Sequence, residues 1–387
     1  MRVFFFLCFL IQENFMRLFG RKGARDAARP ALLRAVSGAI SFGEWPRSYE
    51  AQVREAYLSN AIAQRAVRLV AEQAGGVGVV ADEGHGSVAR LISATSAGQS
   101  LIETIAMYLL LHGNGYVHVA LDSAGEPAEL FALRPERVTV EPGADGWPAA
   151  YLYKAGERAT RLPVRDGTGK PAILHVKAPH PVDDHYGLGC LGAAAGAVAI
   201  HNAATRWNKA LLDNAARPSG ALVYDPGDDG ATLSGEQFAR LKAELEESFQ
   251  GSANAGRPML LEGGLKWQAM SLSPADMDFV GLKAAAAREI ALAFGVPPLL
   301  LGLPGDNSYA NYAEANRALW RQTVLPLAEK IVAALEQGLR AWWPGLSLRV
   351  DRDAIVALSE DRERLWARVS AADFLTPEEK RGMLGLG

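Results

Sequence analysis

Apolar residues recur at helical spacing along much of the chain, and turn residues divide one central stretch into short runs. Residues 50–74 carry apolar side chains every three or four positions and end at Gly75-Gly76, which predicts a helix. Residues 100–111 predict a second helix, which stops at Gly113. Short runs bounded by Gly, Pro and Asp then predict strands at 116–121, 130–134, 138–141, 149–154 and 172–177. We expect these strands to form an antiparallel sheet.

The second half of the chain is mainly helical. An Ala-rich helix is predicted from Gly192 to Asn214, and another over 276–294 ends at Gly295. The longest predicted helix covers 309–342. Within it Pro326 removes one backbone hydrogen bond and clashes with the preceding turn, which predicts a kink.

Segment 221–272, between the first two of these helices, has the pattern of a small separate unit. Ser234 and Gln237 form a capping box at the start of an amphipathic helix. Strands are predicted around that helix at 221–224, 259–261 and 267–270. The chain ends with a strand at 346–350 and charged helices between 355 and 384. The whole pattern predicts an α+β fold.

Composition excludes several classes of protein. A hydrophobic share of 49% excludes a disordered chain, and 40 Lys+Arg against 43 Asp+Glu exclude a globally basic nucleic-acid binder. The only cysteines are Cys8 and Cys190, which exclude a disulfide framework and a Cys-rich zinc or iron–sulfur site. We therefore expect a reducing compartment.

The N-terminal residues need a separate interpretation. Residues 3–11 form an apolar run behind Arg2 that is too short to span a bilayer, and no small-residue cleavage site follows it. We expect Met16 to be the natural initiator and residues 1–15 to be an upstream start extension. Residues 16–45 predict a flexible basic arm. One interpretation is that this arm contacts nucleic acid or a partner, and the other is that it is a solvated tail. No membrane partner is expected, although a membrane-attached adaptor using residues 3–11 stays an alternative.

A glycine-rich turn from Gly187 to Gly192 matches the GxGxxG fingerprint of dinucleotide-binding proteins, with Asp213 placed 21 residues after the last glycine. In those proteins the turn comes directly off a strand, whereas here a segment with two prolines intervenes. The following helix also leads to a single strand rather than to repeated strand–helix units. The alternative is that these glycines allow close helix packing, so a dinucleotide-dependent enzyme remains the second function class.

Three imidazoles and two carboxylates gather between His175 and His185, enough in number for a divalent metal. Their spacing does not repeat on one helix face, so a polar surface loop is the default interpretation and no metal or cofactor is expected. No nucleophile elbow, Walker A motif, HExxH or kinase signature is present in the sequence. These absences favour a structural or binding role over catalysis.

Seven further motifs occur in a distinctive order. They are Leu111-His112-Gly113-Asn114-Gly115-Tyr116, Leu133-Arg134-Pro135-Glu136-Arg137-Val138, Asp184-His185-Tyr186-Gly187-Leu188-Gly189, Asn214-Ala215-Ala216-Arg217-Pro218-Ser219-Gly220, Gly256-Arg257-Pro258-Met259-Leu260-Leu261-Glu262-Gly263-Gly264, Ala287-Arg288-Glu289-Ile290-Ala291-Leu292-Ala293-Phe294-Gly295-Val296-Pro297-Pro298 and Gly305-Asp306-Asn307-Ser308-Tyr309-Ala310-Asn311-Tyr312. Together they resemble the portal proteins of tailed bacteriophages, a family that also supplies portals to gene transfer agents. One departure is Gly189-Cys190-Leu191, where Ser-Pro-Leu is expected in the family.

The resemblance implies a non-enzymatic ring, usually of twelve copies of the chain, at one vertex of a capsid. Double-stranded DNA would pass through the ring without sequence preference. The implied partners are the large terminase, the major capsid protein and head-tail adaptor proteins. The implied location is a virion or phage-like particle assembled in the cytoplasm of a bacterial host.

The resemblance also implies a division of the chain into a mixed α/β wing, a two-helix stem, a clip, a tunnel helix and a crown. The implied segments are wing 46–188, first stem helix 189–220, clip 221–272, second stem helix 273–296, tunnel loop 297–308, kinked tunnel helix 309–343, and wing return strand with crown helices 344–387.

Candidate site residues follow from these segments. The expected channel residues of the tunnel loop are Leu299, Leu301, Leu303, Pro304, Asp306 and Asn307. Residues 299–308 contain no Lys or Arg, which suits a conduit because a basic track would hold the phosphates of DNA. Lys283, Arg288 and Arg317 add positive charge near the loop, either for DNA or for salt bridges between subunits. In the clip, the candidates for contact with the motor are Arg240, Lys242, Glu244, Arg257 and Lys266, unless this is a solvated face.

Overall fold

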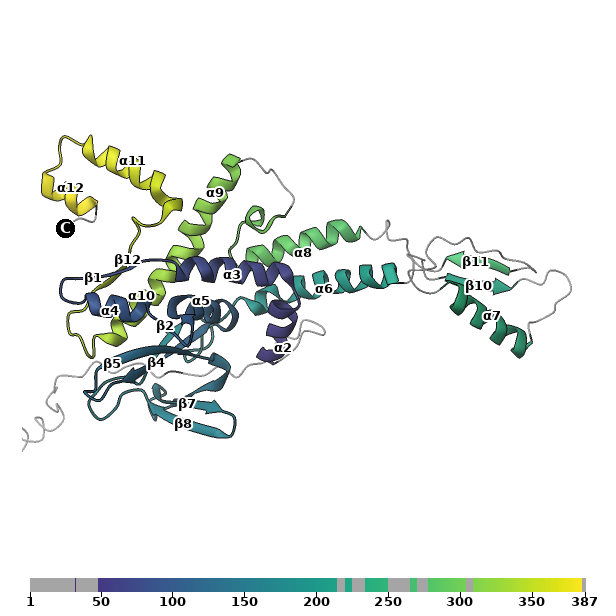
Figure 1. Ribbon diagram of the computed structural model, residues 1–387, viewed down its shortest axis with the longest axis horizontal. Coiled ribbons are helices and arrows are strands. Elements are labelled where there is room, and N and C mark those ends of the chain that lie inside the picture. Colours follow the sequence, from purple (N-terminus) through teal and green to yellow (C-terminus); the bar gives the residue numbers. More distant parts are fainter. Residues whose placement is uncertain are drawn as a thin grey trace, which may run out of the picture.

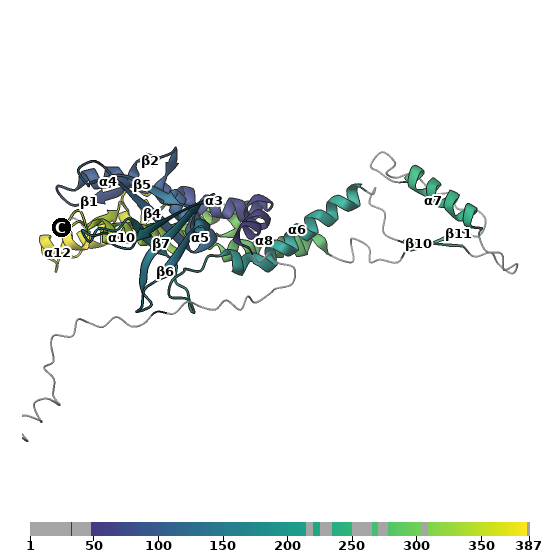
Figure 2. The same cartoon turned by 90° about the horizontal axis from the view of Figure 1, so that it is seen from below.

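Two helices project side by side from the main body of the chain, and a small unit lies beyond their ends (Figures 1 and 2). The computed structural model describes residues 32, 48–213, 220–224, 234–249, 265–269, 278–303 and 309–384. We call the two helices, α6 (Leu191–Asp213) and α8 (Phe279–Ala293), the hairpin. The distal unit is made of β10 (Gly220–Tyr224), α7 (Gly235–Phe249) and β11 (Leu265–Ala269). Cys8, the expected 1–15 extension and nearly all of the 16–45 arm lie outside the described residues.

The first helical segment of the body is broken near its middle. The elements are α2 (Tyr49–Val53), the π-helical turn η1 (Arg54–Leu58) and α3 (Ala61–Gly75). The prediction of one helix over 50–74 is therefore wrong at Asn60. The Asn60 backbone is extended, and its side chain accepts hydrogen bonds from the N–H groups of Ile62 and Ala63, so a new helix starts there.

The next helix and the strands form the centre of the body. Helix α5 (Leu101–His112) ends at Gly113, whose φ of 83° is the left-handed conformation that glycine adopts without strain, as predicted. The strands are β4 (Asn114–Leu121), β5 (Pro127–Leu133), β6 (Val138–Pro142), β7 (Pro148–Ala155), β8 (Arg158–Pro163) and β9 (Ile173–Lys177). They form two antiparallel three-stranded sheets, β5-β4-β9 and β6-β7-β8, instead of the single sheet expected. The polar strand β8 was not predicted.

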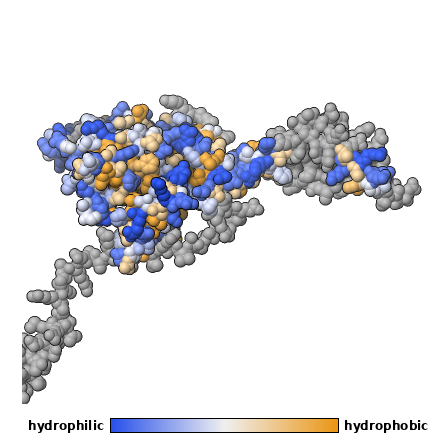
Figure 3. All heavy atoms as spheres, turned by 60° about the horizontal axis from the view of Figure 1, so that its bottom comes forward, coloured by the Kyte–Doolittle hydropathy of each residue, from blue (hydrophilic) through white to orange (hydrophobic). Residues whose placement is uncertain are grey.

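Two hydrophobic clusters hold these layers together. Helices α3 and α5 and the later helix α10 bury residues such as Val67, Ile105 and Leu335 with one face of β4 and β9. A smaller cluster around Tyr116 and Tyr151 lies between the two sheets. On the face of the body that Figure 3 shows, hydrophobic residues lie among hydrophilic ones.

Short elements complete the body and bring the C-terminal part back to it. They are β1 (Val79–Ala81), α4 (Gly86–Ser93), β2 (Thr95–Ser96), β3 (Gln99–Ser100), η2 (Pro135–Arg137), β12 (Leu348–Val350), η7 (Val356–Leu358), α11 (Ser359–Ser370) and α12 (Pro377–Met383). Strand β12 pairs antiparallel with β1, with Val80 opposite Arg349. The predicted C-terminal strand and charged helices are confirmed.

The long helix predicted over 309–342 has three parts. They are α9 (Tyr309–Leu319), the π-helical turn η6 (Trp320–Val324) and α10 (Leu325–Leu339). Pro326 occupies the first turn of α10, so the irregularity predicted from this proline is present as the wide turn just before it. Within the part of the chain that the structure describes, no helix is both long and apolar enough to cross a bilayer.

Candidate functional site

The hairpin buries several small side chains and contains one aromatic stack. Helix α6 leads away from the body and α8 returns to it (Figure 1). Ala194 and Ala197 at the start of α6 belong to the core of the body, and Ala204 of α6 and Ala286 and Ala287 of α8 are also buried. Alanines let two helices approach closely. Farther from the body, Trp207 and Phe279 stack with ring centroids 5.9 Å apart. The predicted pair of long helices is confirmed, with bounds that differ by a few residues.

Asn114 joins the end of α5 to the turn that leads into α6. This residue is fully buried, and its Oδ1 accepts hydrogen bonds from the Gly187 N–H (2.8 Å) and the His175 Nε2–H (3.0 Å). Its Nδ2 donates to His112 Nδ1 (3.0 Å) and to the carbonyl oxygens of His112 and Gly187 (both 3.3 Å). Two of the motifs that carry the family resemblance therefore meet at one side chain.

The two histidines bound to Asn114 are neutral at pH 7. Burial lowers the pKa of His112 to about 4 and that of His175 to about 3. His175 also stacks on Tyr116, with ring centroids 4.3 Å apart. Because His112 Nδ1 accepts a hydrogen bond from Asn114, its ring proton is on Nε2.

The glycine-rich turn packs backbone against backbone at the end of α5. A Cβ on Gly187 would collide with Gly113 and Ala178, and one on Gly189 would collide with Leu111. The Cys190 N–H donates to the Leu110 carbonyl oxygen at 2.7 Å. The packing interpretation is confirmed for Gly187 and Gly189 and wrong for Gly192, which faces open space.

The histidine-rich loop does not gather its imidazoles at one point. His175 binds Asn114, His180 Nδ1 accepts from the Val182 N–H, and His185 Nε2–H donates to the Gly146 carbonyl oxygen at 2.6 Å. Asp183 accepts hydrogen bonds from two backbone N–H groups of its own loop. Among the described residues, no group of His, Cys, Asp or Glu side chains is arranged to hold a metal ion.

A second buried junction fixes the middle of α6 to the body. Asn60 Nδ2 donates to Asn202 Oδ1 (2.8 Å) and to His201 Nδ1 (3.2 Å). Asn202 Nδ2 donates in turn to the carbonyl and carboxylate oxygens of Glu55. This junction was not predicted from the sequence, in which its only signal is an Asn placed before an apolar helical run.

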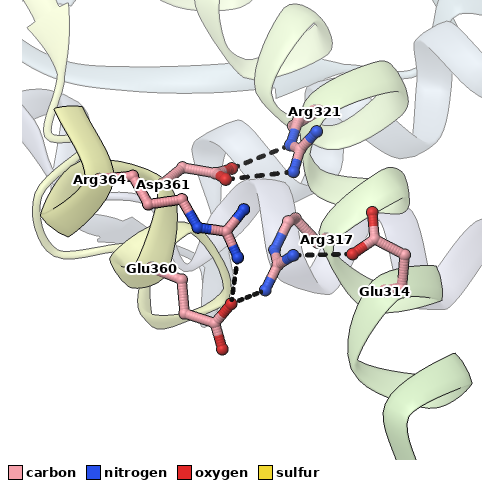
Figure 4. Close-up of polar contacts among 6 residues, drawn as sticks. All are labelled: Glu314, Arg317, Arg321, Glu360, Asp361 and Arg364. Atoms are coloured by element: carbon pink, nitrogen blue, oxygen red, sulfur yellow. Dashed lines mark hydrogen bonds and ion pairs between the residues drawn. The ribbon is translucent and has the colours of Figure 1, made fainter. Parts of the chain in front are cut away.

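Helix α11 is fixed to α9 and η6 by ion pairs (Figure 4). The Arg317 side chain is only 11% exposed and binds Glu314 at 2.7 Å and also Glu360. Arg321 binds both carboxylate oxygens of Asp361, at 2.9 and 3.2 Å. Arg364 reaches Glu360 as well. The guanidinium of Arg317 therefore serves a contact within the chain.

Replacing Glu360 with glutamine is expected to destabilise this contact by roughly 1–2 kcal/mol, because Arg317 keeps one charged partner and loses the other. The Glu360 side chain is 58% exposed, so solvent screens part of the attraction. Urea unfolding measures the change. Glu363→Gln, at an exposed position of the same helix, is the matched control, and equal losses in the two variants would contradict the assigned contact.

Only part of the expected channel segment lies among the described residues. Leu299 and Leu301 are half-buried in a 3₁₀ turn, η5 (Pro298–Leu301), and Leu301 packs against the core of the body. The segment thus starts as an anchored turn and not as the irregular loop expected. Leu303 is half-buried, while Pro304, Asp306 and Asn307 lie outside the described residues.

The basic channel candidates have different surroundings. Lys283 is half-buried on α8 beside His201, and Arg288 is exposed on the same helix. Arg317 is held on α9 by the ion pairs above, so its assignment to the channel stays a prediction without support from its contacts. No described contact brings the three together.

The clip candidates occur on the distal unit. Arg240 and Lys242 are exposed on α7, Glu244 lies on the same helix, and Lys266 lies on β11. Arg257 and the predicted strand at 259–261 lie outside the described residues. The capping box is confirmed, because the Gln237 N–H donates to Ser234 Oγ and the Ser234 N–H donates to Gln237 Oε1. Strands β10 and β11 pair antiparallel.

Comparison with known proteins gives consistent matches over nearly the whole chain. The phage portal protein family matches residues 57–385. An uncharacterized protein of Rickettsia felis is 42% identical over 86% of this chain and 88% of its own length. A chain in the virion of a native gene transfer agent particle is 48% identical with a TM-score of 0.68, and the match covers 91% of this chain and 96% of that one.

A second solved structure is the neck of a native gene transfer agent particle, computed with C12 symmetry. Its matching chain is also 48% identical, with a TM-score of 0.67 and coverage of 89% of this chain and 94% of that one. The matched family and the two matched particle chains are structural and not enzymatic, so the dinucleotide-dependent enzyme is the wrong alternative. The chain belongs to the phage portal protein family, the proteins that connect head and tail.

Proposed function

We propose that twelve copies of this chain form a ring at one capsid vertex, through which double-stranded DNA is packaged and ejected. The observation that carries the proposal is the hairpin, which extends from the body and bears a separate small unit at its far end, in a chain of the portal family (Figure 1). The C12 symmetry of the matched neck supports the number of copies.

In this proposal each part of the chain has a position in the ring. The hairpin is the stem (189–220 and 273–296), and the distal unit is the clip (221–272). Most of the body is the wing (46–188), and α9, η6 and α10 form the tunnel helix (309–343) after the tunnel loop (297–308). The crown is the helical part of 344–387.

DNA would slide past the tunnel loop because the loop offers no cation to hold phosphates. Leucine, proline, Asp306 and Asn307 are the residues proposed to face the duplex. Of the basic channel candidates, Arg288 is exposed on α8. Arg317 is instead bound by Glu360 in the proposed crown.

The clip is the proposed docking surface for the large terminase and afterwards for head-tail adaptor proteins. Its support is α7, which exposes Arg240 and Lys242 at the end of the molecule farthest from the body. The wing would contact the major capsid protein. The assembled ring would belong to a phage-like particle built in the host cytoplasm.

The ring itself is tested by mass photometry and negative-stain microscopy of the purified chain, alone and with the capsid protein. We expect rings of about twelve copies, as in the C12 neck, with a central hole that admits a DNA duplex. A chain that stays monomeric or dimeric under both conditions would contradict the proposal.

The docking surface is tested by the double variant Arg240→Glu/Lys242→Glu. Reversing two exposed charges is expected to lower the amount of nuclease-protected DNA per particle by roughly tenfold, because repulsion weakens the encounter with the motor. The number of rings should not change. Arg158→Glu, on exposed strand β8 of the body, is the control, and an equal drop there would argue against docking at α7.

A further inference from the structure

A pocket of about 720 Å³ opens where the hairpin meets the body. Its lining combines α2, η1 and the start of α3 with α6 and α8, which lie far away in the sequence. Arg54 and Glu55 lie on η1, His201 and Arg206 on α6, and Lys283 on α8. The buried junction of Asn60 and Asn202 forms part of its wall, so the pocket is built on a fixed framework.

Positive charge exceeds negative charge in this pocket. Arg54, Arg206 and Lys283 line it, and among its described lining residues Glu55 is the only one with a carboxylate. Arg206 approaches Glu55 at 3.7 Å, which is a long ion pair, and Glu55 also accepts a hydrogen bond from Asn202. Among the described residues, no carboxylate lies within ion-pair distance of Lys283 or Arg54.

His201 adds a neutral donor to the same pocket. Asn60 Oδ1 is used by two backbone N–H groups, so its Nδ2 is the group that donates to His201 Nδ1. The His201 ring proton is therefore on Nε2, for which the described residues offer no acceptor. Burial lowers the pKa of His201, and the nearby Lys283 ammonium lowers it further, so the ring stays neutral at pH 7. The pocket combines cations and a free donor, the surroundings that an oxyanion requires.

The exposed side chains of the hairpin indicate where that oxyanion comes from. Next to the pocket, α6 exposes Ile200 (41%) and Trp207 (42%), and the Trp207 ring also stacks on Phe279 of α8. On the side turned away from α6, helix α8 exposes Leu282 (44%), Glu289 and Leu292 (79%) at helical spacing. Within the described residues, Glu289 has no hydrogen bond or ion pair. In a ring, each copy meets its two neighbours through different surfaces, so a cationic flank can face an acidic one.

We propose that this pocket is an oxyanion site filled by the Glu289 carboxylate of the adjacent copy in the ring. The inference rests on the proposed ring and names one of its contacts. A recess between the hairpin and the body admits a single side chain more easily than the backbone of a DNA duplex, and the exposed leucines beside Glu289 would extend over Ile200 and Trp207. The contact would lock the base of each stem to its neighbour.

The test measures ring assembly by mass photometry over a series of protein and NaCl concentrations. Lys283→Met, Arg206→Gln and Glu289→Gln are each expected to raise the protein concentration for half-assembly by roughly fivefold, which corresponds to about 1 kcal/mol. Added NaCl should reduce the difference between these variants and the unchanged chain. Lys154→Met, at an exposed position of β7 in the body, is the matched control and should assemble as the unchanged chain does.

A charge exchange identifies the partner residue. Lys283→Glu and Glu289→Lys should each impair assembly, and the double variant should recover most of it, because the pair is restored across the boundary. Circular dichroism of each variant at low concentration checks that the subunit is folded.

The outcomes separate this inference from the proposed function. If the unchanged chain forms no rings, the proposed function fails. If it forms rings and the variants assemble equally well, or if the double variant shows no recovery, the site is wrong and the ring stands. If the pocket variants assemble normally but their particles contain a different amount of DNA, the assignment to Glu289 is wrong and the pocket binds a phosphate of DNA.

Discussion

Asn114→Leu is expected to lower the free energy of unfolding by roughly 4 kcal/mol, one of the two largest effects predicted for this chain. Leucine has a similar volume but makes none of the hydrogen bonds of the Asn114 side chain. The Gly187 N–H and the His175 Nε2–H would lose their acceptor inside the protein. Each unpaired buried group costs about 1–3 kcal/mol, and no water has room to replace the amide at a fully buried position.

Urea unfolding followed by circular dichroism measures this loss. Gln99→Leu, at an exposed position, is the matched amide-to-leucine control and should change stability by no more than about 0.5 kcal/mol. Hydrogen exchange adds a local readout, since the Gly187 amide should exchange faster in Asn114→Leu. A loss below about 1 kcal/mol would show that the amide is not the link between α5 and the turn before α6.

Local signals in the sequence were sufficient to predict the positions of most helices. Gly113 ends α5 because a left-handed residue is needed there, and the apolar periodicity gave α6, α8 and the charged C-terminal helices within a few residues. The same signals predicted one helix where the structure has α2, η1 and α3. An Asn is tolerated inside a helix, and only the structure shows that the Asn60 side chain caps α3. Strand β8 was not predicted because its first four residues are exposed on both faces and show no apolar alternation, although Leu162 packs against the smaller cluster.

The sites depend on contacts that no local pattern contains. Asn114 and Gly187 are 73 positions apart, and Asn60 and Asn202 are 142 positions apart, so their meeting follows from the fold and not from spacing. Arg317 was expected to face DNA or a neighbouring subunit, yet Glu360 of a distant helix in the same chain binds it. The histidine-rich loop shows the opposite case, because residues close in sequence there point to separate partners.

Lowering the pH from 6.5 to 4.5 is expected to reduce the free energy of unfolding by roughly 5 kcal/mol through His112 and His175 alone. Burial holds the pKa of His112 at about 4 and that of His175 at about 3, whereas both are near 6.5 in the unfolded chain. The unfolded state therefore binds more protons between these values, so acid favours unfolding. The stabilising contribution is complete above about pH 6.5 and declines by about 1.4 kcal/mol per pH unit for each histidine as the pH falls toward the folded-state pKa.

The double variant His112→Asn/His175→Gln isolates this effect, because it keeps the hydrogen bonds and removes both titrating groups. The asparagine amide oxygen can replace His112 Nδ1 as an acceptor, and the glutamine amide nitrogen can replace His175 Nε2 as a donor. The variant should be less stable than the unchanged chain at pH 7, since Tyr116 and Tyr49 lose their ring contacts. Its stability should nevertheless fall less steeply in acid, so the difference between the two chains shrinks or reverses by pH 4.5. If the stabilities of the two chains instead fall in parallel between pH 6.5 and 4.5, His112 and His175 can take up protons without breaking the hydrogen bonds of Asn114 at the base of α6.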